Sequence, residues 1–449
     1  MGFFSRFVSE MNGLGIMIAI LHLGLAVAFT LNTATPLQNA NTSPSSHIFD
    51  LHLPYKEGSF SVKENVDGGK RDVEALLSFK DGITANPMRA LSNWTSPIQK
   101  MCASGLVFGV ENIPTEWWSI PPQLGQLKAL RVLDLRRNKL VGSIPKSLAN
   151  FSQLQWIRLP YNHLTGSIPA EFGGLGKLEH LRLTSNLLSG SILDSLGNCT
   201  SLIDFIVGFN FLTGTIPKTI RQLKSLQLLY LYEKNLTGPI PYEIGELKNL
   251  SEIFIYKNNL SEGIPESLAA LNNCTALKRL KLSSNSFDGD LGIHFSSSIE
   301  AFSAHSNHFS GTLPASLGNS SNITLLDFNK NRLIGLEGFS SPSVSQMKGN
   351  TLYEDIPAIK IKGNEYRLEY VLAANTILDL SNNKLRGKIP PNIGSLSQLR
   401  LLNLCGNQLE GMIPASLGQI EPLEQLDLSR NKLSGEIPKE LSKLFKLSY

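Results

Sequence analysis

The sequence predicts an α/β solenoid, in which a repeated unit of strand, turn and short helix stacks into one long parallel sheet. The first observation is a recurring pattern, LxxLxLxxNxLxGxIP, whose asparagine returns every 24 residues through much of the chain. The second is length, because 449 residues exceed what one compact core usually serves. The third is composition, because 37 glycines and only 8% aromatic residues suit repeated turns.

Each position of the repeat has a physical role. Leu133 and Leu135 point into one core from a short strand, and successive strands stack in parallel about 4.8 Å apart. Asn138 turns inward, where its amide satisfies backbone groups freed as the chain leaves the strand. Gly142 permits the bend, and Ile144 is buried again. The asparagine position is held by Asn138, Asn162, Asn186, Asn210, Lys234, Asn258, Asn285, Asn307, Asn331, Asn383, Asn407 and Asn431.

Residues 1–34 are expected to form a signal peptide. Arg6 supplies a positive charge, an apolar run extends from Leu14 to Leu31, and Ala26-Val27-Ala28 offers a small-x-small cleavage pattern. An uncleaved anchor is the alternative, because about 18 apolar residues could just span a bilayer. No second apolar run follows, so we expect no other membrane anchor in the chain as given.

Residues 35–70 are polar and predict a linker, and residues 71–112 predict a helical cap at the start of the array. Asp72 suits the N-cap position of that helix, and the apolar residues after it follow helical spacing. Repeats are expected over residues 113–334 and 374–449. The last unit stops within its opening, so we expect a truncated product or a partial gene model.

The pattern xLxGxIP, as in Leu140–Pro145, resembles the plant-specific class of leucine-rich repeat. In that class it implies a twisted, right-handed superhelix with a small sheet beside the main one. The cap, with Leu91-Ser92-Asn93-Trp94, resembles the N-terminal cap of plant receptor ectodomains. Caps of that family carry a cysteine pair. Here Cys102 matches the first cysteine and Gly109 stands near the place of the second, so the chain departs from the family at this disulfide.

Residues 335–373 interrupt the repeats. Asn331 and Asn383 are 52 residues apart, and the tract between them includes the segment Tyr353–Tyr366, which lacks the repeat pattern. The tract resembles the island before the last repeats of plant receptor-like proteins and peptide-hormone receptor kinases, and this resemblance implies a part in a ligand or co-receptor site. A degenerate repeat with a long loop is the alternative.

Nothing in the sequence indicates catalysis, a cofactor or a metal site. Kinase motifs and a phosphate-binding loop are absent, and Gly173-Gly174-Leu175-Gly176 is interpreted as a turn between repeats. His305 and His308 lack metal-ligand spacing. Cys199 and Cys274 fall in a column of apolar core positions. The net charge of +4 is too small to indicate nucleic acid. We therefore expect no enzyme, no cofactor and no nucleic-acid partner.

The residues that the strands present outward on the concave face change character from the second to the seventh unit. Aromatic and basic side chains replace the small or polar residues of the last three units. An exposed aromatic stripe flanked by cations fits an extended peptide with an acidic group. Unselected variation, or burial of the rings under glycans, is the alternative. The candidate ligand-binding residues are Trp156, Arg158, Tyr161, Arg182, Phe209, Tyr230, Tyr232, Phe254, Tyr256, Arg279 and Lys281.

Sequons of the form Asn-x-Ser/Thr agree with export, because they are glycosylation acceptors of secreted proteins. Some fall inside the repeat pattern and could arise from it. The sequons that we expect to carry glycans begin at Asn93, Asn150, Asn198, Asn235, Asn249, Asn259, Asn273, Asn319 and Asn322.

Three functions compete. The resemblance implies the ligand-binding ectodomain of a cell-surface receptor, which senses a peptide, protein or pathogen-derived ligand and then meets a shorter leucine-rich-repeat co-receptor kinase. Its expected location is the extracellular face of the plasma membrane, and the membrane anchor expected for that family is not found in the chain as given. A secreted repeat protein of the apoplast, inhibiting foreign wall-degrading enzymes or acting as a soluble decoy, is the alternative. A structural wall adhesion protein is the third.

Overall fold

The computed structural model describes residues 107–109, 119–120, 122–126, 130–266, 276–292, 298–313, 323–336, 359–361, 364–366 and 376–448. The chain divides into two units, Met1–Lys56 and Glu57–Tyr449, and every described residue lies in the second unit. The predicted signal peptide, the linker, most of the cap and most of the island therefore lie outside the described residues.

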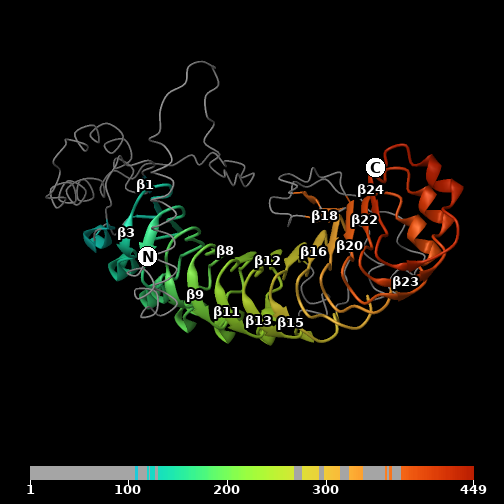
Figure 1. Cartoon of the computed structure of the whole chain (residues 1–449). Helices are drawn as coiled ribbons and strands as arrows, with labels where there is room; N and C mark the ends of the chain where they lie inside the picture. The colour runs from blue at the N-terminus through green and yellow to red at the C-terminus, as the bar shows by residue number, and fades with distance from the viewer. Residues whose placement is uncertain are drawn as a thin grey trace, which may run out of the picture. The chain divides into compact units, whose positions relative to one another are not determined.

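One long parallel sheet runs through the described part of the chain, as predicted (Figure 1). Its neighbours pair in parallel register, for example Leu133 with Ile157 and Leu229 with Ile253, with one shift between Thr376 and Ile377 where β20 meets β22. In order, its thirteen strands are β1 (Val107–Gly109), β2 (Val132–Asp134), β4 (Trp156–Arg158), β6 (His180–Arg182), β8 (Asp204–Ile206), β10 (Leu228–Tyr230), β12 (Glu252–Phe254), β14 (Arg279–Lys281), β16 (Ala301–Ser303), β17 (Leu325–Asp327), β20 (Thr376–Asp379), β22 (Leu399–Asn403) and β24 (Gln425–Asp427).

Smaller parallel sheets lie beside the long one, and they confirm the additional sheet that the repeat pattern implied. Gly142 adopts a φ of 77°, a left-handed conformation that other residues rarely take, and it bends β3 away from the core. These strands are β3 (Val141–Ser143) with β5 (His163–Thr165); β7 (Ser189–Ser191), β9 (Phe211–Gly214), β11 (Asn235–Gly238), β13 (Asn259–Glu262) and β15 (Ser286–Phe287); and β21 (Arg386–Gly387), β23 (Gln408–Gly411) and β25 (Lys432–Leu433).

The interruption between β17 and β20 contains one described element pair, a short antiparallel hairpin of β18 (Ile359–Ile361) and β19 (Asn364–Tyr366). Despite the 52-residue interval in the sequence, β17 and β20 pair directly, with Leu326 opposite Leu378. The insertion therefore leaves the long sheet continuous.

Short 3-10 helices return the chain from one strand to the next, and most of them follow an extended residue, usually proline. Gly173 is needed at one of them, because a Cβ there would lie 2.4 Å from the carbonyl oxygen of Ser195 in the next turn. The helices with described bounds are η2 (Pro122–Gln126), η3 (Lys146–Asn150), η4 (Ala170–Gly174), η5 (Asp194–Asn198), η6 (Lys218–Gln222), η7 (Tyr242–Glu246), η10 (Pro391–Ser395), η11 (Ala415–Gln419) and η12 (Lys439–Lys443).

The asparagines of the repeat form a ladder through the array, as predicted. The Nδ2 of Asn162 donates to the carbonyl oxygens of Leu135 at 2.8 Å and Leu159 at 3.1 Å, and its Oδ1 accepts from the Leu140 N–H at 3.1 Å. The residue before each asparagine turns through a left-handed conformation, for example Tyr161 with a φ of 58°. Each such side chain, which we term a rung of the ladder, thus forms hydrogen bonds with backbone groups of its own and the previous repeat that have no backbone partner there.

Cys199 is fully buried, as expected for its column, and burial raises the pKa of its thiol to about 11. Cys274 lies outside the described residues. Within the described part of the chain, no helix combines the length and apolar character needed to cross a membrane.

Candidate ligand-binding face

The outward face of the long sheet carries most of the candidate residues. In β4 the middle residue is buried and the first and third point outward, so that Ile157 is fully buried while Trp156 and Arg158 on either side are half-buried. Tyr232 and Tyr256 follow their strands by two residues. Tyr161 and Phe209 occupy the left-handed turn position, at the border of this face. The candidates therefore lie on consecutive strands, β4 to β14, or at their ends.

Four aromatic rings and one aliphatic side chain form what we term the aromatic cluster: Ile206, Tyr230, Tyr232, Phe254 and Tyr256. The rings of Tyr230 and Phe254 stack with centroids 4.3 Å apart and planes 8° apart. Tyr232 and Tyr256 stack at 4.8 Å and 3°. Each pair spans β10 and β12, because residues 24 apart share a column of the sheet.

The expectation of an exposed aromatic stripe is wrong for the three tyrosines of this cluster. Tyr230, Tyr232 and Tyr256 retain only 6%, 7% and 9% of their exposed area. Strand spacing and ring thickness explain this burial, because rings on adjacent strands are close enough to cover each other's faces. Because the ring faces cover each other, the cluster is unsuited to stacking a flat ligand on a ring face.

Gly208 makes room for the ring of Tyr232, and the sequence reasoning missed it. A Cβ at Gly208 would lie 2.4 Å from two carbons of that ring. Beside it, Phe209 remains 37% exposed and meets Tyr232 edge to face, with centroids 5.4 Å apart and planes 86° apart. We term this space the notch at Gly208. The sequence could have revealed it, because Gly208 occupies the same repeat position as Tyr232 and Tyr256 in the next two repeats.

Arginines lie on the β1 side of the cluster, but carboxylates of this chain already engage them. Arg158 donates to Asp134 at 3.3 Å, and the Nε of Arg182 donates to Asp204 at 2.6 Å. Asp204 is 1% exposed and also hydrogen-bonds the Nδ1 of His180. These acids were not among the predicted residues, and only the strand register brings Asp204 beside His180.

Trp156 joins this network through its ring. His180 stacks on it with centroids 3.3 Å apart, and the guanidinium carbon of Arg158 lies 4.2 Å from the ring centroid. Cation–π contacts of this kind hold a basic side chain in a fixed orientation. We term Trp156, Arg158, His180, Arg182 and Asp204 the ionic network.

Basic residues also lie on the β14 side of the aromatic cluster. The Lys281 ammonium lies 4.6 Å from the ring centroid of Phe254. Arg279 donates to Glu252 at 2.8 Å, and Glu252 in turn accepts from the hydroxyl of Tyr230. Burial, followed by the neighbouring Glu252 carboxylate, raises the pKa of Tyr230, so that its hydroxyl stays protonated and donates.

The later strands carry a different set, which we term the acid column: Asp327, Asp379, Asn403 and Asp427, on β17, β20, β22 and β24. Asp327 and Asp379 are each 2% exposed. Burial raises the pKa of both carboxyls, and the charge of Asp327 raises that of Asp379 further. Asp379 accepts from the Ser381 N–H at 2.9 Å and weakly from Asn403 at 3.4 Å.

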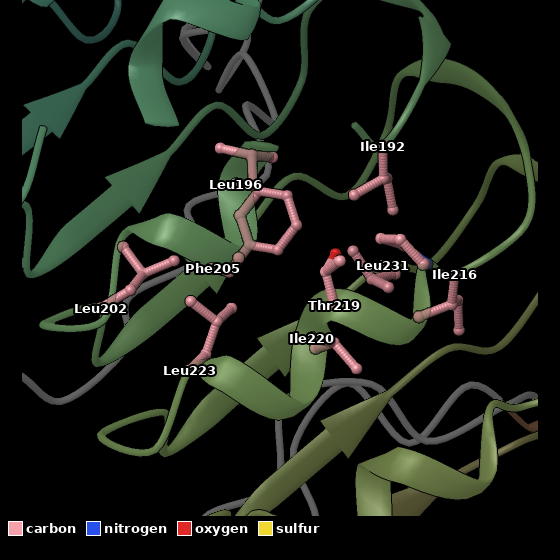
Figure 2. Close-up of a pocket in the computed structure, with 11 residues that line it drawn as sticks. Ile192, Leu196, Leu202, Phe205, Ile216, Thr219, Ile220, Leu223 and Leu231 are labelled. Atoms are coloured by element: carbon pink, nitrogen blue, oxygen red, sulfur yellow. The ribbon is translucent and has the colours of Figure 1, made fainter. Parts of the chain in front are cut away.

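Figure 2 shows a cavity inside the array, beneath the outward face. Its volume is about 10 Å³, and apolar side chains line it, except for Thr219. A space of this size holds at most one water, and an apolar lining offers such a water few partners. The cavity is therefore a packing gap and not a ligand site. Among the described residues, no group of three or more His, Cys, Asp or Glu could hold a metal ion.

Comparison with known proteins agrees with this architecture. A family model for the leucine-rich repeat matches residues 128–188 and 376–448, and one for the leucine-rich repeat N-terminal domain matches residues 70–104. The chain is similar to Receptor-like protein 19 of Arabidopsis thaliana, with 35% identity over 124 residues, which cover 27% of this chain and 12% of that protein.

Solved structures give the same result. A TDR receptor superposes with a TM-score of 0.64 at 30% identity, covering 73% of this chain and 52% of that one. The Arabidopsis receptor kinase HAESA, solved with the peptide hormone IDA and the co-receptor SERK1, superposes with a TM-score of 0.59 at 27% identity, covering 84% of this chain and 69% of that one. The chain thus spans about half of the TDR receptor chain, and its match covers a small part of the receptor-like protein. The repeat, the ladder and these likenesses together show a leucine-rich-repeat array that is similar to those of plant receptor-like proteins and receptor-kinase ectodomains.

Proposed function

We propose that this chain is the ligand-binding part of a plant cell-surface receptor, and that it binds an extended peptide across β4 to β14. The observation that carries the proposal is the unequal outward face: aromatic and basic side chains gather on these strands, whereas β17 to β24 carry acidic, amide or aliphatic ones. Aromatic side chains are enriched at recognition sites, and Phe209 at the border of this cluster is 37% exposed.

The geometry supports a particular binding mode. The stacked rings and the ionic network are held by one another, so little side-chain freedom is lost when a ligand binds. Phe209 is the exposed apolar group beside the notch at Gly208, and we infer that an apolar residue of the peptide packs there. An acidic group elsewhere in the peptide would meet basic side chains on both flanks, where the arginines already bond carboxylates of this chain.

The likeness to HAESA supports a two-partner mechanism. That receptor kinase is solved in complex with a peptide hormone and a co-receptor. We infer that the peptide-bound face of this chain meets a shorter leucine-rich-repeat co-receptor kinase at the cell surface. The proposed glycans fit this arrangement, since the asparagines of the described sequons are all exposed: Asn150, Asn198, Asn235, Asn249 and Asn259.

Two phenylalanines provide a matched test of the binding face. Phe209 borders the outward face at 37% exposure, whereas Phe211, 42% exposed, lies on β9 of the lateral sheet. Binders are selected from a random display library of 12-residue peptides against the purified chain, and their affinities are measured by calorimetry. Phe209→Ala should weaken binding at least tenfold, a loss of about 1.4 kcal/mol, and Phe211→Ala should leave it unchanged. Equal effects of the two variants would place the site elsewhere.

A further inference from the structure

One rung of the asparagine ladder is a lysine. At a normal rung, the Nδ2 of Asn210 donates to the carbonyl oxygen of Val207 at 2.9 Å, and its Oδ1 accepts from the Leu188 N–H at 3.0 Å. Lys234 occupies the next rung, and its ammonium donates to that same Val207 oxygen. Lysine has no acceptor atom, so the Leu212 N–H, the counterpart of the Leu188 N–H, loses the partner that asparagine would supply.

The lysine rung lies between the repeat of β8 and the repeat of β10, which we term the β8–β10 joint. The cavity of Figure 2 lies at the same joint. Its lining comes partly from Ile192–Phe205, which leads into β8, and partly from Ile216–Leu231, which leads into β10. Side chains around an empty space lack contacts on one side, so packing across this joint is incomplete.

Two backbone hydrogen bonds across the β8–β10 joint are slightly longer than their equivalents across the next joint, whereas the bonds accepted by the carbonyl oxygens of Ile203 and Gln227 match between the two joints. Across the β8–β10 joint, the Val207 N–H donates to Tyr230 at 3.0 Å and the Phe209 N–H donates to Tyr232 at 3.2 Å. The equivalent bonds across the β10–β12 joint, from Leu231 to Phe254 and from Glu233 to Tyr256, measure 2.8 and 3.0 Å. The β10–β12 joint has a normal rung at Asn258, so it provides an internal reference within the same molecule.

Lys234 is also a buried amine, and no described carboxylate forms an ion pair with it. It is 6% exposed, and its ladder neighbours Asn210 and Asn258 are neutral. Glu233, the residue before it in the chain, pairs with Lys257. Burial alone lowers the pKa of Lys234 from its ordinary 10.5 to about 7.

We propose that the β8–β10 joint is a proton-controlled joint of the solenoid, tight when the Lys234 amine is neutral and loosened when it is charged. Local opening of the joint hydrates the amine and returns it to its ordinary proton affinity. Because the opened state then binds one more proton than the closed state above pH 7, opening becomes less favourable as pH rises. The aromatic cluster spans this joint, because Ile206 lies on the β8 side and Tyr232, which packs over Gly208, lies on the β10 side. Protonation of Lys234 therefore also weakens the packing of Ile206 and Gly208 against Tyr232.

Amide hydrogen exchange on the full chain tests the proposal between pH 6 and pH 9. Protection factors, corrected for intrinsic exchange, are compared for the Val207 and Phe209 amides and for the reference amides of Leu231 and Glu233. We expect protection at the β8–β10 joint to be constant below pH 7 and to rise about tenfold per pH unit above it. The reference amides should show no such rise. Equal pH dependence at both joints, or none at either, would overturn the proposal.

Two substitutions separate the charge from the shape of the rung. Lys234→Met keeps the length of the side chain and removes the amine, so the pH dependence should disappear. Asn258→Lys should transfer the dependence to the β10–β12 joint. If Asn258→Lys does not fold, the comparison of wild type with Lys234→Met still decides, because persistence of the pH dependence in Lys234→Met excludes Lys234 as its source.

Discussion

The aromatic cluster and the acid column occupy equivalent positions of the same repeat, on different strands of one sheet. Tyr230 and Asp379 are both the last residue of a strand, and the residue before each of them packs into the core. Beneath them, the leucines and the ladder asparagines are nearly identical, and both regions pair in the same parallel register. The inward columns therefore determine where a side chain lies, and the outward columns remain free to differ.

Buried carboxylates allow the two regions to be compared by experiment. In the ionic network a basic side chain balances the carboxylate charge, and in the acid column none does. Asp204 of the ionic network bonds Arg182 and His180. Asp379 of the acid column receives a backbone N–H and an amide, and its neighbour in register is another acid, Asp327. The same residue type should thus stabilise the fold in the first region and destabilise it at neutral pH in the second.

Removing Asp204 should have the largest effect. Asp204→Ala leaves Arg182 and His180 beside a site from which their carboxylate is missing, and breaking a buried pair in this way costs about 3–5 kcal/mol. Urea titration monitored by tryptophan fluorescence would measure the change, since Trp156 stacks on His180. Asp134→Ala is the control: its side chain is 13% exposed and bonds Arg158 at 3.3 Å, so the loss should be near 1 kcal/mol. Equal losses would contradict the special role of Asp204.

Filling the notch at Gly208 should come second. Gly208→Ala places a Cβ against the Tyr232 ring, which must leave its stack on Tyr256, and overpacking of this kind costs about 1–3 kcal/mol. Proton NMR of the tyrosine rings would detect the loss of stacking, and affinity for a selected peptide should fall with it. Unchanged ring shifts would mean that the cluster adapts without moving Tyr232.

Neutralising Asp379 should have the smallest effect and the opposite sign. A carboxyl with a raised folded pKa contributes stability at low pH and loses it as pH rises through that pKa. Asp379→Asn is neutral throughout, so it should match wild type near pH 4 and exceed it at pH 7.5 by on the order of 1 kcal/mol. Thermal melts across this pH range would measure the difference.

Asp427→Asn is the control for this prediction, because Asp427 stands in the same column and is 7% exposed, at the end away from Asp327. Its effect should be smaller at every pH. A stabilisation of Asp379→Asn that does not vary with pH would show that the proton is not its cause.

The fold could be predicted from the sequence because its causes are local and periodic. The ladder bonds of Asn162, the bend at Gly142 and the burial of Cys199 each depend on a position within one repeat, and the structure confirms each of them. The cap helix, most of the island and the sequons at Asn93, Asn273, Asn319 and Asn322 lie outside the described residues, so those calls remain predictions.

The sequence predicted where the candidate side chains lie on the sheet, but it did not predict their burial or their bonding partners. Periodicity placed Tyr230 and Tyr256 on the outward face correctly. It could not show that rings on adjacent strands cover each other, because that depends on pairs of residues 24 positions apart and on the missing side chain of Gly208. For the same reason Arg158 and Arg182 were taken as available to a ligand, although acids of neighbouring strands engage them.

The strand register has a consequence for how such a protein can evolve. The intervals between successive marker residues vary, with 27 residues from Asn258 to Asn285 and 52 from Asn331 to Asn383, yet the strands pair without a shift at either place. Insertions and deletions in the connecting segments therefore leave every outward column in place. Unequal recombination can add, remove or exchange whole repeats, and each new copy arrives with its outward residues already aligned to those of its neighbours.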